Sequence, residues 1–209
     1  MAFTVVIDID GTITPLACLR RKKKQNGDLT ANHPHFFYNI KVIQKLVDFG
    51  LAFYSKRAFV RSNASVAIHK LKQYGCRIVI YNRRYISEKT CLNTEIFLEK
   101  RDIPYDEIIY LGMEGNKAET LKELDPDLVI DDNPTDIEDI KEAGFKITCF
   151  RHKKNKMIEA DHEQIFVAEN WLDVPDIYLE ITKQEPEIKP TSLPNKLNLI
   201  PRIRSPFVR

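Results

Sequence analysis

Apolar and polar positions along the chain alternate between short runs typical of buried strands and longer stretches with helical spacing. Between two of the runs, for example, Ala64, Ile68 and Leu71 recur at intervals of three or four positions, which is the spacing of one helix face. This alternation predicts an α/β fold, a Rossmann-like three-layer arrangement with a parallel sheet between helices. The predicted strands are Phe3 to Ile7, Arg77 to Ile80, Ile108 to Leu111, Leu128 to Ile130 and Phe145 to Phe150.

Residues typical of helix ends lie at the joints of this pattern. Gly75 and Gly144 each follow a helical stretch and precede a strand, where a helix C-terminus needs a residue with positive φ. Pro134 indicates a helix start, and Thr135 with Glu138 has the spacing of a capping box. We therefore expect helices to end at Gly75 and at Gly144.

The first two predicted strands are too far apart for a crossover of one helix. Residues 15 to 58, which lie between them, are predicted to form a small, largely helical cap. The core domain then comprises residues 1 to 14 and 59 to 174. Five of the eleven prolines follow residue 185, and we predict an extended, basic tail over residues 175 to 209.

Charge is unevenly distributed along the 209 residues, although the formal net charge is only +2. Residues 186 to 209 carry five basic residues against one acidic residue, and Arg20 to Lys24 form a run of five basic residues. The remaining body is acidic. This arrangement argues against a uniformly basic nucleic-acid-binding surface but keeps nucleic acid open as a less favoured partner.

The sequence also predicts the compartment. No basic region precedes Asp8, so no signal peptide is expected, and no apolar run approaches the roughly 18 residues of a membrane span. The four cysteines form no Cys-x-x-Cys pair. We expect a cytoplasmic protein with reduced thiols and no membrane association.

Carboxylates follow two of the predicted strands. Asp8 and Asp10 leave the first strand, and Asp131 and Asp132 leave the strand that starts at Leu128. The carboxyl ends of parallel strands share one edge, where open α/β sheets bind ligands. Like charges so close together require a shared cation or a retained proton, and Mg²⁺ prefers oxygen ligands.

These residues resemble the motifs of the haloacid dehalogenase-like superfamily of phosphohydrolases. Asp8-x-Asp10-Gly11-Thr12 corresponds to the first motif, Lys117 to the third, and Asp131-Asp132 to the fourth. The resemblance extends over about residues 4 to 174. Within the superfamily, nucleotidases related to 5′(3′)-deoxyribonucleotidases are similar at Ile80-Tyr81-Asn82-Arg83-Arg84, Ile103-Pro104-Tyr105-Asp106, Val129-Ile130-Asp131-Asp132-Asn133 and Glu169-Asn170-Trp171-Leu172.

The resemblance implies Mg²⁺-dependent hydrolysis of a small phosphomonoester, with a nucleotide as the favoured substrate. Asp8 is then the nucleophile that forms an aspartyl-phosphate, Asp10 is the general acid and base, and Lys117 neutralises charge. The implied metal ligands are the Asp8 side chain, the Asp10 backbone carbonyl and Asp132, with Asp131 as an outer or alternative ligand.

One position departs from the family pattern. The family has Thr or Ser at the end of the second-motif strand, where its hydroxyl holds a phosphate oxygen, and this chain has Tyr81. A phenol is longer, so it must turn away, fill the phosphate pocket, or bind a differently placed oxygen. The amide of Asn82 is a candidate substitute, and Arg83 and Arg84 either bind phosphate or are surface charges. The candidate substrate-binding residues are Gly11, Thr12, Tyr81, Asn82, Arg83 and Arg84.

Two other functions remain open from the sequence. The basic segments are compatible with a phosphatase that acts on nucleic-acid ends. Tyr81 is compatible with a non-catalytic binding or regulatory protein that has kept the fold.

Overall fold

The computed structural model describes residues 2–15, 59–83, 87–112, 116–153 and 155–182, together with the backbone of one strand at 202–204. Apart from residue 15, the predicted cap lies outside the described residues, as does most of the predicted tail. The described ranges contain all of the predicted core domain except residues 1, 84–86, 113–115 and 154.

A parallel sheet with β1 at its centre confirms the predicted α/β architecture. Its strand order is β6-β5-β4-β1-β2-β3-β7, and every pair of neighbours is parallel. All five predicted strands are present, and β6 and β7 are additional. The strands are β1 (Thr4–Asp8), β2 (Arg77–Asn82), β3 (Glu107–Tyr110), β4 (Leu128–Asp131), β5 (Ile147–Phe150), β6 (Ile165–Ala168) and β7 (Arg202–Arg204).

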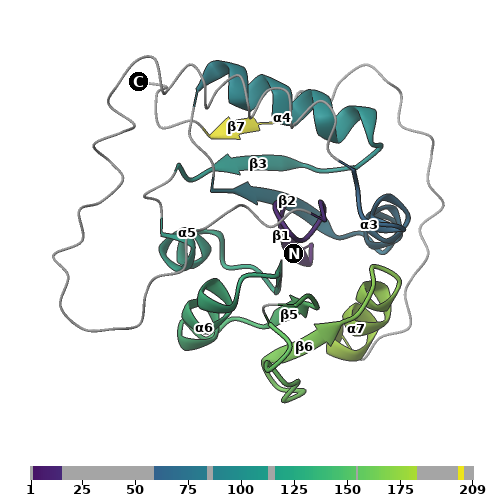
Figure 1. Cartoon of the computed structure of the whole chain (residues 1–209), viewed down its shortest axis with the longest axis vertical. Coiled ribbons are helices and arrows are strands. Elements are labelled where there is room, and N and C mark those ends of the chain that lie inside the picture. Colours follow the sequence, from purple (N-terminus) through teal and green to yellow (C-terminus); the bar gives the residue numbers. More distant parts are fainter. Residues whose placement is uncertain are drawn as a thin grey trace, which may run out of the picture.

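Helices cover both faces of the sheet (Figure 1), with α5 and α6 on one side and α3 and α7 on the other. Successive residues of β1 face opposite layers of the core, because side chains alternate along a strand. Val6 packs in the layer with α5 and α6, whereas Ile7 packs in the layer with α3, α4 and α7. The helices are α3 (Ala64–Gln73), α4 (Glu88–Lys100), α5 (Lys117–Leu124), α6 (Pro134–Glu142) and α7 (Asp173–Thr182).

The register of the central strands brings their carboxyl ends level. Asp8 at the end of β1 pairs with Tyr81 of β2, and Ile7 pairs with Ile130 of β4. Ile7 and Ile130 are completely buried, and burying a side chain of this size stabilises the fold by about 1.5–3 kcal/mol. The packing of these strands therefore determines which polar residues meet at the edge.

The helix ends agree with the prediction in part. Gly75 and Gly144 have φ values of +85° and +89°, which confirms both as helix-terminating glycines. The predicted capping box of Thr135 and Glu138 is wrong. The N-cap of α6 is Asn133, whose side chain accepts a hydrogen bond from the backbone N–H of Thr135 at 3.2 Å. Pro134 then occupies the first helical turn, where it needs no hydrogen-bond acceptor.

The predicted start of an extended tail at residue 175 is also wrong, because α7 continues to Thr182. Pro175 lies in the first turn of this helix, where a missing N–H costs little. Tyr178 is buried, stacks on Tyr74 with ring centroids 5.2 Å apart, and meets the ring of Phe3 edge-on at 5.0 Å. This part of the predicted tail therefore belongs to the core.

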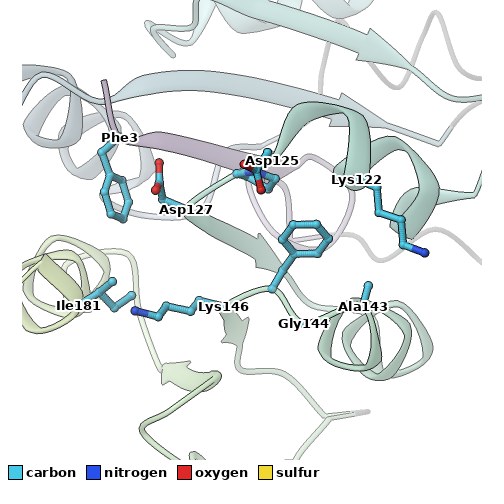
Figure 2. A pocket seen from close by; sticks show the side chains of 10 residues that line it. Phe3, Lys122, Asp125, Asp127, Ala143, Gly144, Lys146 and Ile181 are labelled. Carbon is cyan, nitrogen blue, oxygen red and sulfur yellow. The ribbon is translucent and has the colours of Figure 1, made fainter. Parts of the chain in front are cut away.

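A pocket of about 610 Å³ lies at the edge opposite Asp8 (Figure 2), beside the segments that lead into β1, β4 and β5. Phe3, Asp127, Lys146 and Ile181 are among its lining residues. Within the described ranges, none of the helices has the length and apolar character that a membrane crossing requires. The thiols of Cys76, Cys91 and Cys149 are free.

Asp161 organises the turn that leads into β6. One of its carboxylate oxygens accepts hydrogen bonds from the backbone N–H groups of Glu163, Gln164 and Ile165, and the other lies 2.9 Å from Lys141 Nζ. The backbone hydrogen bond from Ile165 and the contact with Lys141 hold the pKa of Asp161 well below its usual range.

We expect Asp161→Asn to lower the free energy of unfolding by roughly 1 kcal/mol at pH 7, because charge-assisted hydrogen bonds are lost. The stability that comes from a depressed pKa is fully present above the unfolded-state value and is lost as the pH falls toward the folded-state value. The difference from wild type should therefore narrow as the pH falls below about 4. Urea unfolding of wild type and Asp161→Asn gives the difference in the free energy of unfolding at pH 7 and at pH 3. Glu163→Gln, a charge loss at an exposed side chain nearby, is the control, and equal stability of wild type and Asp161→Asn at pH 7 would contradict the expectation.

Candidate active site

Three buried carboxylates meet at the carboxyl edge of the sheet. Asp8 ends β1, Asp131 ends β4, and Asp132 follows it; oxygens of all three lie within 4.8 Å of one another. Their exposed fractions are 6%, 0% and 3%. Asp10 lies beyond the end of β1, half-buried, and its backbone bridges to Thr14. The structure thus brings three of the four predicted metal-ligating aspartates into one cluster, with Asp10 in the adjoining turn.

Lys117 supplies the positive charge of this cluster. Its Nζ atom lies 2.9 Å from Asp8 Oδ1, 2.5 Å from Asp131 Oδ2 and 3.0 Å from Asp136 Oδ2. Burial opposes the charged form of the Lys117 side chain, but the carboxylates of Asp131, Asp8 and Asp136 together outweigh it and raise its pKa above the ordinary value. The ammonium group is therefore a fixed charge at any physiological pH.

The carboxylates carry more negative charge than Lys117 alone neutralises. Burial raises the pKa of Asp8 well above its usual value, and the neighbouring aspartates add to this effect while Lys117 opposes it. Burial also raises the pKa of Asp132 to about 7, with a further contribution from Asp131. A further cation would stabilise the charged forms of Asp8 and Asp132. Because the donors are carboxylate oxygens, the arrangement fits a hard divalent ion such as Mg²⁺.

The loop after Asp8 is held by donors from distant parts of the chain. The guanidinium group of Arg61 donates to the carbonyl of Gly11 from Nε at 2.9 Å and from Nη2 at 2.7 Å. The indole N–H of the fully buried Trp171 donates to the carbonyl of Thr12 at 3.1 Å. The backbone N–H of Arg61 donates to Ile13. These contacts fix the loop that positions Asp10.

Gly11 permits Asp132 to approach the loop backbone. Its φ is +100°, and a Cβ atom built at this position would lie 2.2 Å from Asp132 Oδ2. The hydroxyl of Thr12 donates to Asp132 Oδ1 at 3.1 Å. A glycine is therefore required at this position, because a carboxylate of the cluster lies against the loop backbone.

The predicted substrate-binding residues in and after β2 differ from one another in their contacts. Tyr81 is completely buried and faces Lys117 and Asp131. Asn82 is 2% exposed, and its side-chain Nδ2 has no hydrogen-bond partner in the part of the chain that the structure describes. Arg83 lies 3.2 Å from Asp136 through Nη2. Arg84 lies outside the described residues.

Three residues near the cluster were not predicted. Asp136 binds Lys117, Arg61 binds the loop, and His152 Nε2 lies 3.2 Å from Asp132 Oδ2. His152 follows β5, at the carboxyl edge where ligands bind in such sheets. Its place after a predicted strand was therefore an available signal. Asp136 lies one helical turn after the Asp-Asp pair, and no sequence pattern marked it as a residue of the site.

Comparisons with known proteins bear on the fold and on the family of this chain. No protein-family model matches the chain. A curated protein from Clostridium acetobutylicum, named a nucleotidase, is 29% identical over 182 residues, which cover 81% of this chain and 90% of that protein.

Among solved structures, a D,D-heptose 1,7-bisphosphate phosphatase from B. bronchiseptica, complexed with magnesium and phosphate, has a TM-score of 0.54 at 13% identity. A haloacid dehalogenase-like family hydrolase from Streptococcus pneumoniae also has a TM-score of 0.54, at 11% identity. Each similarity covers 85% of this chain and 98% of the other chain. At these identities, the two structures show that the fold is shared.

Substitution of Gly11 by Ala tests the close approach of Asp132. We expect Gly11→Ala to destabilise the protein more than Gly144→Ala does, although both glycines have positive φ. At Gly144, no heavy atom of the described chain lies within 4 Å of an added Cβ, so the cost is about 1–2 kcal/mol of backbone strain. At Gly11 the overlap with Asp132 should add about 1–3 kcal/mol. Urea unfolding gives both values, and equal losses would refute the close approach.

Proposed function

We propose that this chain, which belongs to the haloacid dehalogenase-like superfamily of phosphohydrolases, is a magnesium-dependent phosphatase that hydrolyses nucleotide monoesters. The observation that carries the proposal is the contact of Lys117 with both Asp8 and Asp131, beside Asp132, at the carboxyl edge of the sheet. The name of the similar Clostridium acetobutylicum protein, a nucleotidase, supports nucleotides as the substrate class.

Asp8 and Asp132 are the side chains that we assign to Mg²⁺, together with the backbone carbonyl of Asp10. Both oxygens of Asp131 already accept hydrogen bonds, one from the backbone N–H of Asn133 and the other from Lys117 and Tyr81. This supports Asp131 as a residue that holds Lys117 and not as a direct ligand. When bound, Mg²⁺ would neutralise negative charge on the phosphate and so favour attack by an anion.

The reaction then proceeds in two steps on the protein's own groups. In the first, a carboxylate oxygen of Asp8 forms a bond to phosphorus while the bond to the leaving oxygen breaks, and Asp10 gives its proton to that oxygen. In the second, water attacks phosphorus, its proton passes to Asp10, and the bond to Asp8 breaks to release phosphate. Lys117 holds Asp8 Oδ1 at 2.9 Å, which fixes the rotation of the carboxylate.

The buried amide of Asn82 is the group that we assign to a phosphate oxygen. Its Nδ2 is a donor with no acceptor among the described residues, and an unmade hydrogen bond of a buried donor costs about 1–3 kcal/mol. A phosphate oxygen would satisfy it. We also assign backbone N–H groups of the loop at Gly11 and Thr12 to the phosphate. The pairing of Arg83 with Asp136 supports a structural role for Arg83.

Replacement of Asp8 by Asn tests the nucleophile directly. We expect Asp8→Asn to lower kcat by about 10³-fold or more, because an amide cannot form the phosphoryl ester and loss of a nucleophile has costs of this size in other enzymes. Phosphate release should be measured with ribo- and deoxyribonucleoside 3′- and 5′-monophosphates, sugar phosphates and a 3′-phosphorylated oligonucleotide, each with Mg²⁺ or EDTA.

Asp125→Asn is the matched control for this screen. It makes the same chemical change at an exposed αL helix cap, at the opposite edge of the sheet, where Asn is equally suited. Its activity should match wild type. Turnover that survives Asp8→Asn would overturn the mechanism, and the absence of turnover on every ester would favour a non-catalytic binding protein. A preference for the oligonucleotide would favour a phosphatase of nucleic-acid ends.

A further inference from the structure

The position of Tyr81 in the sheet places its side chain in the acidic cluster. It pairs with Asp8 in the register of β1 and β2. Paired residues of neighbouring parallel strands project from the same face of a sheet. Tyr81 and Asp8 therefore share a face, and the exposed fraction of Tyr81 is 0%. A large phenol side chain is completely enclosed beside the proposed nucleophile.

The hydroxyl and the ring face of Tyr81 each contact a charged residue of the cluster. The hydroxyl donates a hydrogen bond to Asp131 Oδ2, the oxygen that also lies 2.5 Å from Lys117 Nζ. The ring lies beneath the ammonium group, with Lys117 Nζ 4.5 Å from the ring centroid. At this distance a cation is attracted to the face of an aromatic ring. One side chain thus contacts the ammonium group and the carboxylate that binds it.

These contacts explain why a tyrosine replaces the short hydroxyl residue of the family pattern. The hydroxyl proton of Tyr81 is directed to Asp131, so the group is occupied within the protein. A threonine at this position lacks both the ring face and the reach of the phenol. The longer side chain therefore turns into the acidic cluster, where it contacts Asp131 and Lys117.

We propose that Tyr81 is a positioning residue that holds Lys117 and Asp131 in place for the reaction of Asp8. This inference rests on the proposed phosphatase function for its kinetic consequences. Its structural consequence, the orientation of the acidic cluster, is independent of turnover. Tyr81 is linked to the proposed metal ligand Asp8 through Lys117. Residues that hold the partners of metal ligands typically affect metal affinity or activity by about 10–100-fold.

A graded series of substitutions tests this role. Tyr81→Phe keeps the ring beneath Lys117 but removes the hydroxyl, whereas Tyr81→Met removes both contacts at similar volume. We expect Tyr81→Phe to lower kcat by about 10-fold with KM changed less than about 2-fold, and Tyr81→Met to lower kcat further. Magnesium affinity, measured by isothermal titration calorimetry without substrate, should fall in the same order.

Tyr110→Phe is the matched control. Tyr110 is also a buried tyrosine at the end of a strand, 5% exposed, but its hydroxyl donates to the backbone carbonyl of Cys91 on α4. Tyr110→Phe should leave kcat and magnesium affinity as in wild type. Thermal unfolding of all variants shows whether each is folded, and Tyr81→Phe, which removes one atom, is the variant on which the conclusion depends.

Three results would overturn the proposal. An increase of kcat/KM in Tyr81→Thr would show that the phenol obstructs the phosphate site. A rise of KM in Tyr81→Phe, with kcat unchanged, would show direct contact with substrate. Equal magnesium affinity of Tyr81→Phe and Tyr110→Phe, together with equal kcat, would remove the positioning role. If wild type hydrolyses no phosphoester, the proposed function fails, and magnesium affinity alone decides the role of Tyr81.

Discussion

One buried ammonium group determines how the carboxyl edge of this sheet is built. Lys117, at the first turn of α5, binds Asp8 of β1, Asp131 of β4 and Asp136 of α6. Buried carboxylates are costly without a partner, and removing one partner from a buried ion pair commonly costs about 3–5 kcal/mol. The short helix α5 must therefore lie where its first turn meets both strands. In the proposed reaction, the same charge would act on an anionic substrate without reorganisation.

The fold was predictable where burial leaves a simple pattern. Central parallel strands are covered on both faces, so β1, β2 and β4 read as continuous apolar runs. Other elements carry weaker patterns. The buried face of α4 includes Thr90, Asn93 and Thr94, so its amphipathic spacing is largely hidden. Helix α7 has a proline in its first turn, and the apolar pattern beyond Trp171 is weak, so the sequence suggested an extended chain there.

For the candidate site, the sequence predicted only those residues that lie in a recognisable local motif. Asp8 and the pair Asp131-Asp132 lie at strand ends, and the parallel topology requires them to meet. Arg61 reaches the loop after β1 from the segment before α3, and His152 reaches Asp132 from the segment after β5. The placement of both segments depends on side chains throughout the core. The orientation of Tyr81 likewise depends on the position of Lys117, which spacing along the chain does not encode.

The hydrogen bonds around the cluster join residues that are far apart in the chain. Lys117 binds Asp8 across 109 positions, Thr12 binds Asp132 across 120, and Trp171 binds Thr12 across 159. Contacts of such high sequence separation are slow to form, because the entropy of closing each loop must be overcome first. During synthesis, the first motif leaves the ribosome long before its counter-charge and its supporting tryptophan. The cluster therefore assembles only when nearly the whole core is available. Binding of a cation to its carboxylates would then show that the core has folded.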